Sequence, residues 1–178
     1  MQVRPNKLLK WQRRSYFLFD QVYVSRLNLE SAYTPQLVIN GQYELVGSNR
    51  VEAESAIKKV LQEKSKVKLT IDNVKTMDGK LSFIVHADGD FIKTNLLAAW
   101  VQKQATMKIK AGENIGATLS HINIVRSFSK KTAAVKNEFE LTVPANLVSK
   151  NWALIVLSQQ NDLKITGAVV YEPVSNNP

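Results

Sequence analysis

The sequence predicts an α+β fold. A helix, a β-hairpin and a second helix, residues 1–64, precede an antiparallel β-sandwich, residues 65–178. Two observations lead to this prediction. Apolar residues recur at helical spacing on both sides of an Asn-Gly turn in the first part, and the helical period disappears after Lys64. From there on, eight short β-type runs alternate with turn signals, as in a sandwich.

The first helix is predicted over residues 7–27, which contain neither Gly nor Pro. Its apolar residues recur at helical spacing, and they are Tyr16, Phe19, Val22, Tyr23 and Leu27. Phe17, Leu18 and Val24 lie off that face. We therefore expect this helix to be covered on more than one side.

A hairpin follows, with strands at residues 36–39 and 42–46 joined by Asn40-Gly41. This dipeptide is a strong signal for a two-residue hairpin turn. Pro35 is expected at the first position of the strand, because proline cannot donate to a sheet ladder.

The second helix is predicted over residues 50–63. Asn49 with Glu52 three residues later resembles a capping box. The apolar residues expected on its core-facing side are Val51, Ala53, Ile57, Val60 and Leu61.

The eight β-type runs after Lys64 define the predicted sandwich. Residues 97–102 and 152–158 alternate poorly between apolar and polar, which is typical of strands covered on both faces. The runs are residues 66–74, 80–87, 95–102, 107–110, 121–127, 137–143, 152–158 and 164–171.

Composition excludes several kinds of chemistry. The chain has no cysteine, so it can form no disulfide, thiolate nucleophile or cysteine-ligated metal centre. It has two histidines, and His86 beside Asp88 and Asp90 is a weak metal motif that we expect to be solvated. We therefore predict no metal, no cofactor and no enzyme activity.

The net charge of +9 is divided almost evenly, +4 in residues 1–64 and +5 in residues 65–178. A basic cluster in residues 4–14 could meet nucleic acid or anionic lipid, but it lacks the interleaved aromatic and basic residues of a stacking surface. We expect no nucleic-acid partner. No apolar run approaches the length of about 18 residues that spans a membrane, so no membrane span is expected.

Two stretches resemble one family. YTPQLVINGQ followed by LVGSNRVEAESAI, and GENIGATLSHINIVR at residues 112–126, are similar to segments of a bacterial family of secreted proteins of unknown function. That family has a thioredoxin-like part followed by a β-rich part, and the similarity runs from about Arg13 to about Ala168. The resemblance implies that residues 1–64 form a partial thioredoxin-like unit without its Cys-x-x-Cys half.

The resemblance also implies a role for the residues around Pro35. A thioredoxin-type cis-proline has beside it a backbone that pairs with an extended substrate, so Tyr33, Thr34, Pro35 and Gln36 are candidate peptide-binding residues. The alternative is that Pro35 only begins a strand. The leading prediction for function is a non-catalytic binding or structural module that binds a peptide or protein. The second is a component of a thiol-disulfide oxidoreductase that needs a cysteine-bearing segment absent from this chain.

The second motif is either a structural crossover or a ligand-binding loop. Strand alternation places Arg126 on the same face as Ile122 and Ile124, so we expect a buried arginine that pairs with Glu113. The polar residues of this motif are Glu113, Asn114, His121, Asn123 and Arg126.

Assembly and location complete the sequence-based predictions. A strand at residues 36–39 without a neighbour on its second edge favours pairing with another chain, so we expect a homodimer through residues 1–64. The resemblance implies a periplasmic or secreted protein. The sequence begins without a signal peptide, which leaves a cytoplasmic location open.

Overall fold

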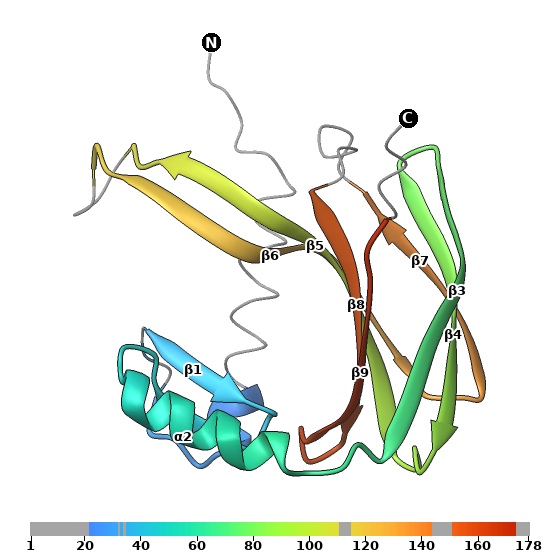
Figure 1. The fold of residues 1–178 in the computed structure, drawn as a ribbon, viewed down its shortest axis with the longest axis horizontal. Coiled ribbons are helices and arrows are strands. Elements are labelled where there is room, and N and C mark those ends of the chain that lie inside the picture. Colours follow the sequence, from blue (N-terminus) through green and yellow to red (C-terminus); the bar gives the residue numbers. More distant parts are fainter. Residues whose placement is uncertain (1–21, 32, 34, 111–114, 144–150, 174–178) are drawn as a thin grey trace. The chain divides into compact units, whose positions relative to one another are not determined.

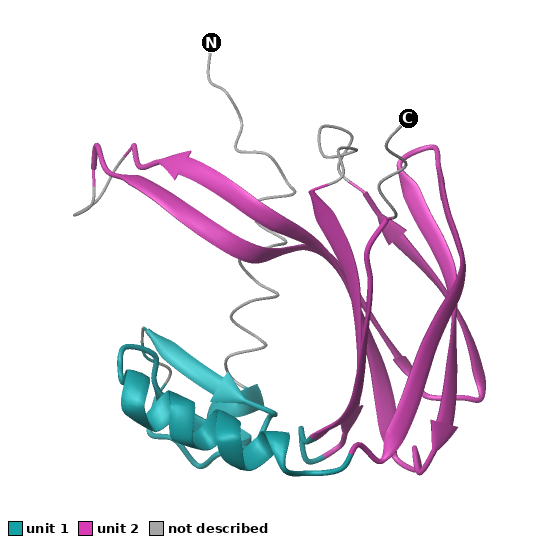
Figure 2. Cartoon of the chain, in the orientation of Figure 1, with its two compact units in different colours: residues 1–64, 162–164 teal, residues 65–161, 165–178 magenta. Residues whose placement is uncertain are grey.

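The structure is a computed structural model, and it describes residues 22–31, 33, 35–110, 115–143 and 151–173. The chain divides into two compact units (Figure 2). Unit 1 comprises residues 1–64 and 162–164, and unit 2 comprises residues 65–161 and 165–178.

Unit 1 contains a helical segment at residues 22–26, strands β1 (Gln36–Ile39) and β2 (Tyr43–Val46), and helix α2 (Arg50–Leu61) (Figure 1). The two strands pair antiparallel as a sheet of their own. Asn40 and Gly41 have φ values of 55° and 71°, the left-handed conformation that the predicted Asn-Gly turn requires. A Cβ at Gly41 would lie 1.8 Å from the carbonyl oxygen of Leu163, so only glycine fits there.

Helix α2 begins at the predicted cap. Asn49 Oδ1 accepts a hydrogen bond from the backbone N–H of Glu52 at 3.3 Å. The Asn49 side-chain amide also donates a hydrogen bond to the Glu52 carboxylate at 2.8 Å, so the two residues are joined by two hydrogen bonds at the start of the helix.

The packed face of α2 is narrower than predicted. Ala56 is buried and Ala53 and Val60 are half-buried, but three residues predicted to face the core are exposed. The physical reason is that a two-stranded sheet of four-residue strands is too small to cover a wide helix face. The exposed residues are Val51, Ile57 and Leu61.

Unit 2 consists of two antiparallel sheets (Figure 1). One has three strands in the order β3-β4-β7, and the other has four in the order β6-β5-β8-β9. The strands are β3 (Val67–Met77), β4 (Lys80–Gly89), β5 (Thr94–Lys108), β6 (Thr118–Thr132), β7 (Lys136–Thr142), β8 (Trp152–Gln160) and β9 (Ile165–Tyr171).

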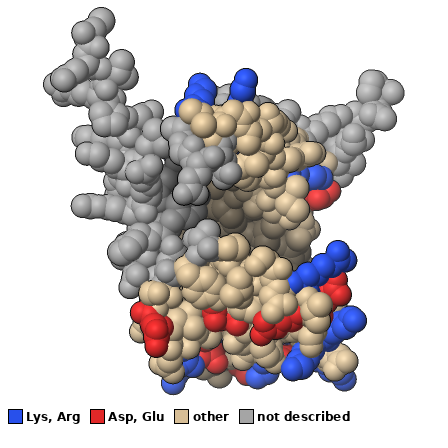
Figure 3. Space-filling model, turned by 90° about the vertical axis from the view of Figure 1, so that its left-hand side faces the viewer, with Lys and Arg blue, Asp and Glu red and all other residues tan. Residues whose placement is uncertain are grey.

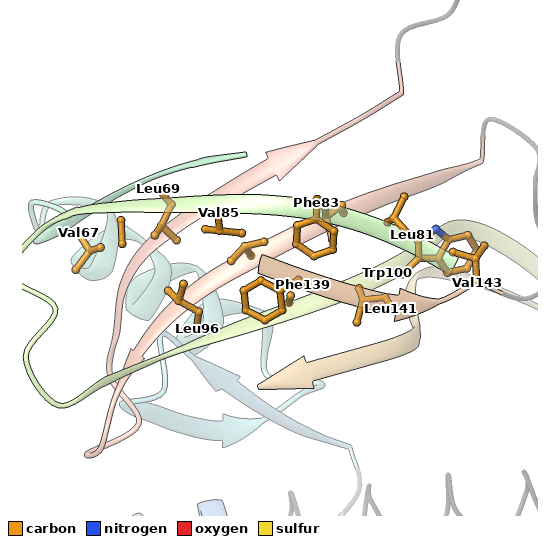
Figure 4. Packing of buried hydrophobic residues seen from close by; sticks show 14 residues of the cluster. Val67, Leu69, Leu81, Phe83, Val85, Leu96, Trp100, Phe139, Leu141 and Val143 are labelled. Carbon is orange, nitrogen blue, oxygen red and sulfur yellow. The ribbon is translucent and has the colours of Figure 1, made fainter. Parts of the chain in front are cut away.

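Apolar side chains from both sheets form one core (Figure 4). Phe83 of β4 stacks on Phe139 of β7 with ring centroids 5.4 Å apart, and Trp100 of β5 is fully buried. Strand β5 is buried on both faces over residues 96–98 and 100–102, as its poor alternation predicts. The cluster comprises Val67, Leu69, Leu81, Phe83, Val85, Ala87, Leu96, Ala98, Trp100, Phe139, Leu141, Val143, Leu154 and Val156.

Strands β5 and β6 are longer than predicted, at 15 residues each. The sequence divides β5 into two runs, residues 95–102 and 107–110, because the residues between them are mostly polar. In the structure the chain continues straight through them. Pairing of β5 with β8 ends at Gln102 opposite Trp152, whereas pairing with β6 continues to Lys108 opposite Thr118. We call the two-stranded extension, residues 103–110 and 115–123, the β5–β6 arm (Figure 1).

The predicted α+β fold class is wrong. Of the described residues, 59% lie in strands and 12% in helices, so the protein is mostly β. A thioredoxin-like helix–hairpin–helix unit is not evident in the described part of the chain. The hairpin joins no larger sheet there, and α2 packs along a narrow stripe only.

Candidate functional site

Three polar side chains meet on one face of the β1–β2 hairpin. Glu44 Oε1 on β2 accepts hydrogen bonds from the Tyr33 hydroxyl and, at 3.1 Å, from the side-chain amide of Gln36. The register of the hairpin explains why Gln36 and Glu44 meet. Gln36 pairs with Val46 and Val38 pairs with Glu44, so the side chains of these four strand residues lie on the same face. The structure thus brings two predicted site residues, Tyr33 and Gln36, together around a third.

The Glu44 carboxylate perturbs Tyr33. The hydrogen bond to Glu44 raises the pKa of Tyr33 from 10.0 to about 12, with smaller contributions from desolvation and from the charges of Glu44 and Glu52. The ionised phenolate would oppose a carboxylate, so the neutral phenol is favoured. Tyr33 therefore remains a hydrogen-bond donor at every physiological pH.

Beside this cluster, β1 presents an open backbone edge. The backbone N–H of Gly47 donates to the carbonyl of Pro35 at 2.8 Å, which marks the two as a hydrogen-bonded pair. Antiparallel pairs alternate, so Leu37 and Ile39 also bond to β2, while the N–H and C=O groups of Gln36 and Val38 point away from it. Within the described residues no strand pairs with that side of β1.

The remaining two residues of the first predicted site are Thr34 and Pro35. Pro35 directly precedes β1, so its missing N–H group removes no backbone hydrogen bond from the strand. Thr34 lies outside the described residues. The thioredoxin resemblance implies a cis bond between Thr34 and Pro35, and this stays a prediction.

The second predicted motif is not gathered into one site by the described residues. Glu113 and Asn114 lie outside them. His121 is exposed opposite Ala105, and Asn123 is exposed with a φ of 53°, which interrupts the regular strand.

Among the described residues Arg126 pairs with an amide, and its predicted pairing with Glu113 stays a prediction because Glu113 lies outside them. Its Nε and Nη2 both donate to Oε1 of Gln102, at 3.0 and 2.7 Å, and the arginine is half-buried rather than buried. Trp100 pairs with Ser127 and Val101 with Val125, so Arg126 is the extra residue of a β-bulge. Strict alternation therefore fails here, and Arg126 cannot be placed from the sequence pattern alone.

Gln102 itself was missed from the sequence. It is a buried polar residue at the point where β5 leaves β8, and its amide donates to the carbonyl of Gln104 at 3.1 Å. Asn151 donates to the same carbonyl at 2.7 Å. These contacts fix the base of the β5–β6 arm, which favours the structural alternative for Arg126.

His86 pairs with Asp72 at 2.8 Å across β3 and β4, not with Asp88 or Asp90. In the described part of the chain no three His, Cys, Asp or Glu side chains gather as metal ligands would.

Residues 12–159 match a family described as "Protein of unknown function (DUF1223)". The chain belongs to this family. The match covers both units and agrees with the resemblance to a family of unknown function. The thioredoxin-like motif itself is not confirmed, and the family description assigns no activity or ligand.

The other comparisons add no function. No curated protein matches this sequence. Two crystal structures of a β-glucosidase from Kluyveromyces marxianus are similar at 10% identity, one selenomethionine-labelled and one in complex with glucose. Their TM-scores are 0.27 and 0.29. The matches cover 66% and 74% of this chain but only 16% and 18% of the β-glucosidase chains. This chain therefore spans less than a fifth of their length. No described helix is long and apolar enough to cross a membrane.

Proposed function

We propose that this family member is a non-catalytic binding protein that takes up an extended peptide by strand addition along β1. The observation that carries the proposal is the open edge of β1, where the backbone groups of Gln36 and Val38 have no strand opposite them in the described residues. An unpaired edge is a template for another extended segment, whose main chain supplies the hydrogen bonds.

Side chains on the same face give this edge a preference. Gln36, Val38 and Glu44 lie side by side across the hairpin. A bound peptide would place every second side chain over this face. The apolar Val38 beside the Glu44 carboxylate favours a peptide with an apolar and a basic residue two positions apart, because both side chains then lie over this face.

The non-catalytic part of the proposal is supported by composition and placement. The chain has no cysteine, and its two histidines lie on different sheets, His86 on β4 and His121 on β6. The two histidines are therefore unsuited to act together in one catalytic site. The family resemblance adds a periplasmic or secreted location to the proposal.

The experiment uses peptides selected by phage display from a random library on the immobilised full chain. Val38→Pro removes the outward N–H, and Val38→Thr is the matched control because it keeps the N–H and a β-branched side chain. We expect Val38→Pro to weaken binding about tenfold or more, and Val38→Thr to bind nearly as well as wild type. Equal affinity for all three proteins, or a failure to select any peptide, would contradict strand addition at β1.

A second candidate is a homodimer through the same edge. The exposed Ile57 and Leu61 of α2 are apolar residues of unit 1 that an association would cover. Light scattering would then give about 40 kDa for the 20.0 kDa chain, and the selected peptide would return the particle to the monomer mass. Dimerisation that the peptide does not disturb would place the interface elsewhere.

A further inference from the structure

The positive charge of unit 2 is concentrated in one segment. Between Asp90 and Glu138 the chain has eight Lys or Arg residues and a single acidic residue, Glu113, which gives a formal charge of +7. The net charges of residues 1–64 and 65–178, +4 and +5, do not reveal this segment, because the rest of residues 65–178 is slightly acidic. The segment contains strands β5 and β6 and the arm that they form.

Unit 1 has a different surface. Figure 3 shows Lys and Arg interspersed with Asp and Glu over the surface of unit 1. On the arm, Lys108 and Lys110 are exposed, and neither forms an ion pair with a described residue. The arm is therefore able to attract an anionic partner.

The arm also exposes apolar side chains on both of its faces. Met107 and Leu119 are opposite each other on one face, and Ile122, opposite Gln104, is on the other. Ile115, close to the tip, is exposed as well. A flat partner would cover only one face, whereas a medium that surrounds the ribbon would cover both.

Self-association of the arm through its edge is disfavoured. The left-handed Asn123 interrupts β6 within the arm, and irregularities of this kind protect edge strands from pairing. Pairing with a second copy would also bring Lys108 and Lys110 close to the same lysines of that copy, and like charges repel each other. Nucleic acid is a poorer fit, because residues 103–123 contain no Phe, Trp or Tyr on which bases could stack.

We propose that the distal β5–β6 arm inserts its apolar side chains into the surface of an anionic lipid bilayer, with Lys108 and Lys110 at the headgroups. Interfacial binding depends on buried apolar area and on attraction to anionic lipid, and the arm offers both. This inference is independent of the peptide site on β1.

The first test is co-sedimentation of the full chain with phosphatidylcholine vesicles that do or do not contain phosphatidylglycerol. We expect partitioning only with phosphatidylglycerol, and weaker binding as salt is added. Ile122→Ser should reduce partitioning about tenfold. Ile92→Ser is the matched control outside the arm, since Ile92 is 76% exposed and Ile122 is 75% exposed.

Charge variants test the lysines separately. Replacing Lys108 and Lys110 by Glu should weaken binding by about fivefold or more for each lysine. Replacing the exposed Lys68 and Lys75 of β3 by Glu changes the net charge equally and should have a smaller effect. Equal losses in both pairs would show attraction to net charge alone, which would overturn a role for the arm.

A fluorescent label reports insertion directly, because the chain has no cysteine of its own. A polarity-sensitive dye on Ile115→Cys should shift to the blue on phosphatidylglycerol vesicles. The same dye on Met77→Cys, also at an exposed apolar position, should not shift. No partitioning, no shift at residue 115, or tighter binding to duplex DNA than to vesicles would each overturn the proposal.

Discussion

At the scale of single residues, Glu44 organises the site beside β1. It accepts from Tyr33 and Gln36, and it raises the pKa of Tyr33 to about 12. Because the pKa in the folded protein lies above the usual value of 10.0, the pH-dependent stabilisation by this pair is complete below pH 10.0. It is lost as the pH rises through about 12.

Spectroscopic titration of tyrosine tests this assignment. The difference between wild type and Tyr33→Phe should show one phenol that ionises at a pH of about 12. In Glu44→Gln the same phenol should ionise closer to 10.0, because the carboxylate is gone. A Tyr33 that titrates normally in wild type would mean that the hydrogen bond to Glu44 does not form in solution.

Sequence reasoning found part of this site for a clear reason. Tyr33 and Gln36 lie within two residues of Pro35, so a motif centred on the proline includes them. Glu44 reaches them across the hairpin, and Gln102 reaches Arg126 across β5 and β6, so both depend on strand register. Register is a property of the pairing and is invisible to a search along the chain.

At the scale of elements, two glycines distinguish backbone strain from steric fit. Gly41 and Gly116 both have positive φ, 71° and 86°. A Cβ at Gly41 would clash with the Leu163 carbonyl, whereas a Cβ at Gly116 would meet no atom of the described residues within 4 Å. We expect Gly116→Ala to cost about 1 kcal/mol of unfolding free energy and Gly41→Ala clearly more.

Urea denaturation of both variants measures the two costs, with Gly116→Ala as the internal control for strain alone. Equal losses would show that Leu163 moves aside without cost, and hence that segment 162–164 is loosely held in unit 1.

Turns and helix caps could be predicted from local sequence signals, whereas the exposure of side chains and the length of strands depend on tertiary contacts. The left-handed Asn40-Gly41 pair and the Asn49 cap depend on neighbours within four residues and occur as predicted, although β2 begins one residue later than expected, at Tyr43. The exposure of Ile57 and Leu61 depends on how large a sheet faces α2. Strand β5 continues through polar residues because β6 pairs with it there, and no local pattern shows that partner.

At the scale of the whole molecule, the strands decide the fold class. Counting short apolar runs underestimates strands such as β5 and β6, whose distal parts are polar or exposed. The same error conceals the arm, and with it the concentration of positive charge between Asp90 and Glu138. The two candidate surfaces therefore lie on different units: the β1 edge on unit 1 and the arm on unit 2.

The central claim is that β1 has an open backbone edge, and amide hydrogen exchange followed by NMR tests it most directly. In the dilute chain, the amide of Val38 should exchange rapidly, while those of Leu37 and Ile39, which bond to β2, should be protected. Adding a selected peptide should slow exchange at Val38. A Val38 amide as protected as Leu37 in the free monomer would contradict the claim, because another segment of the chain would already occupy the edge.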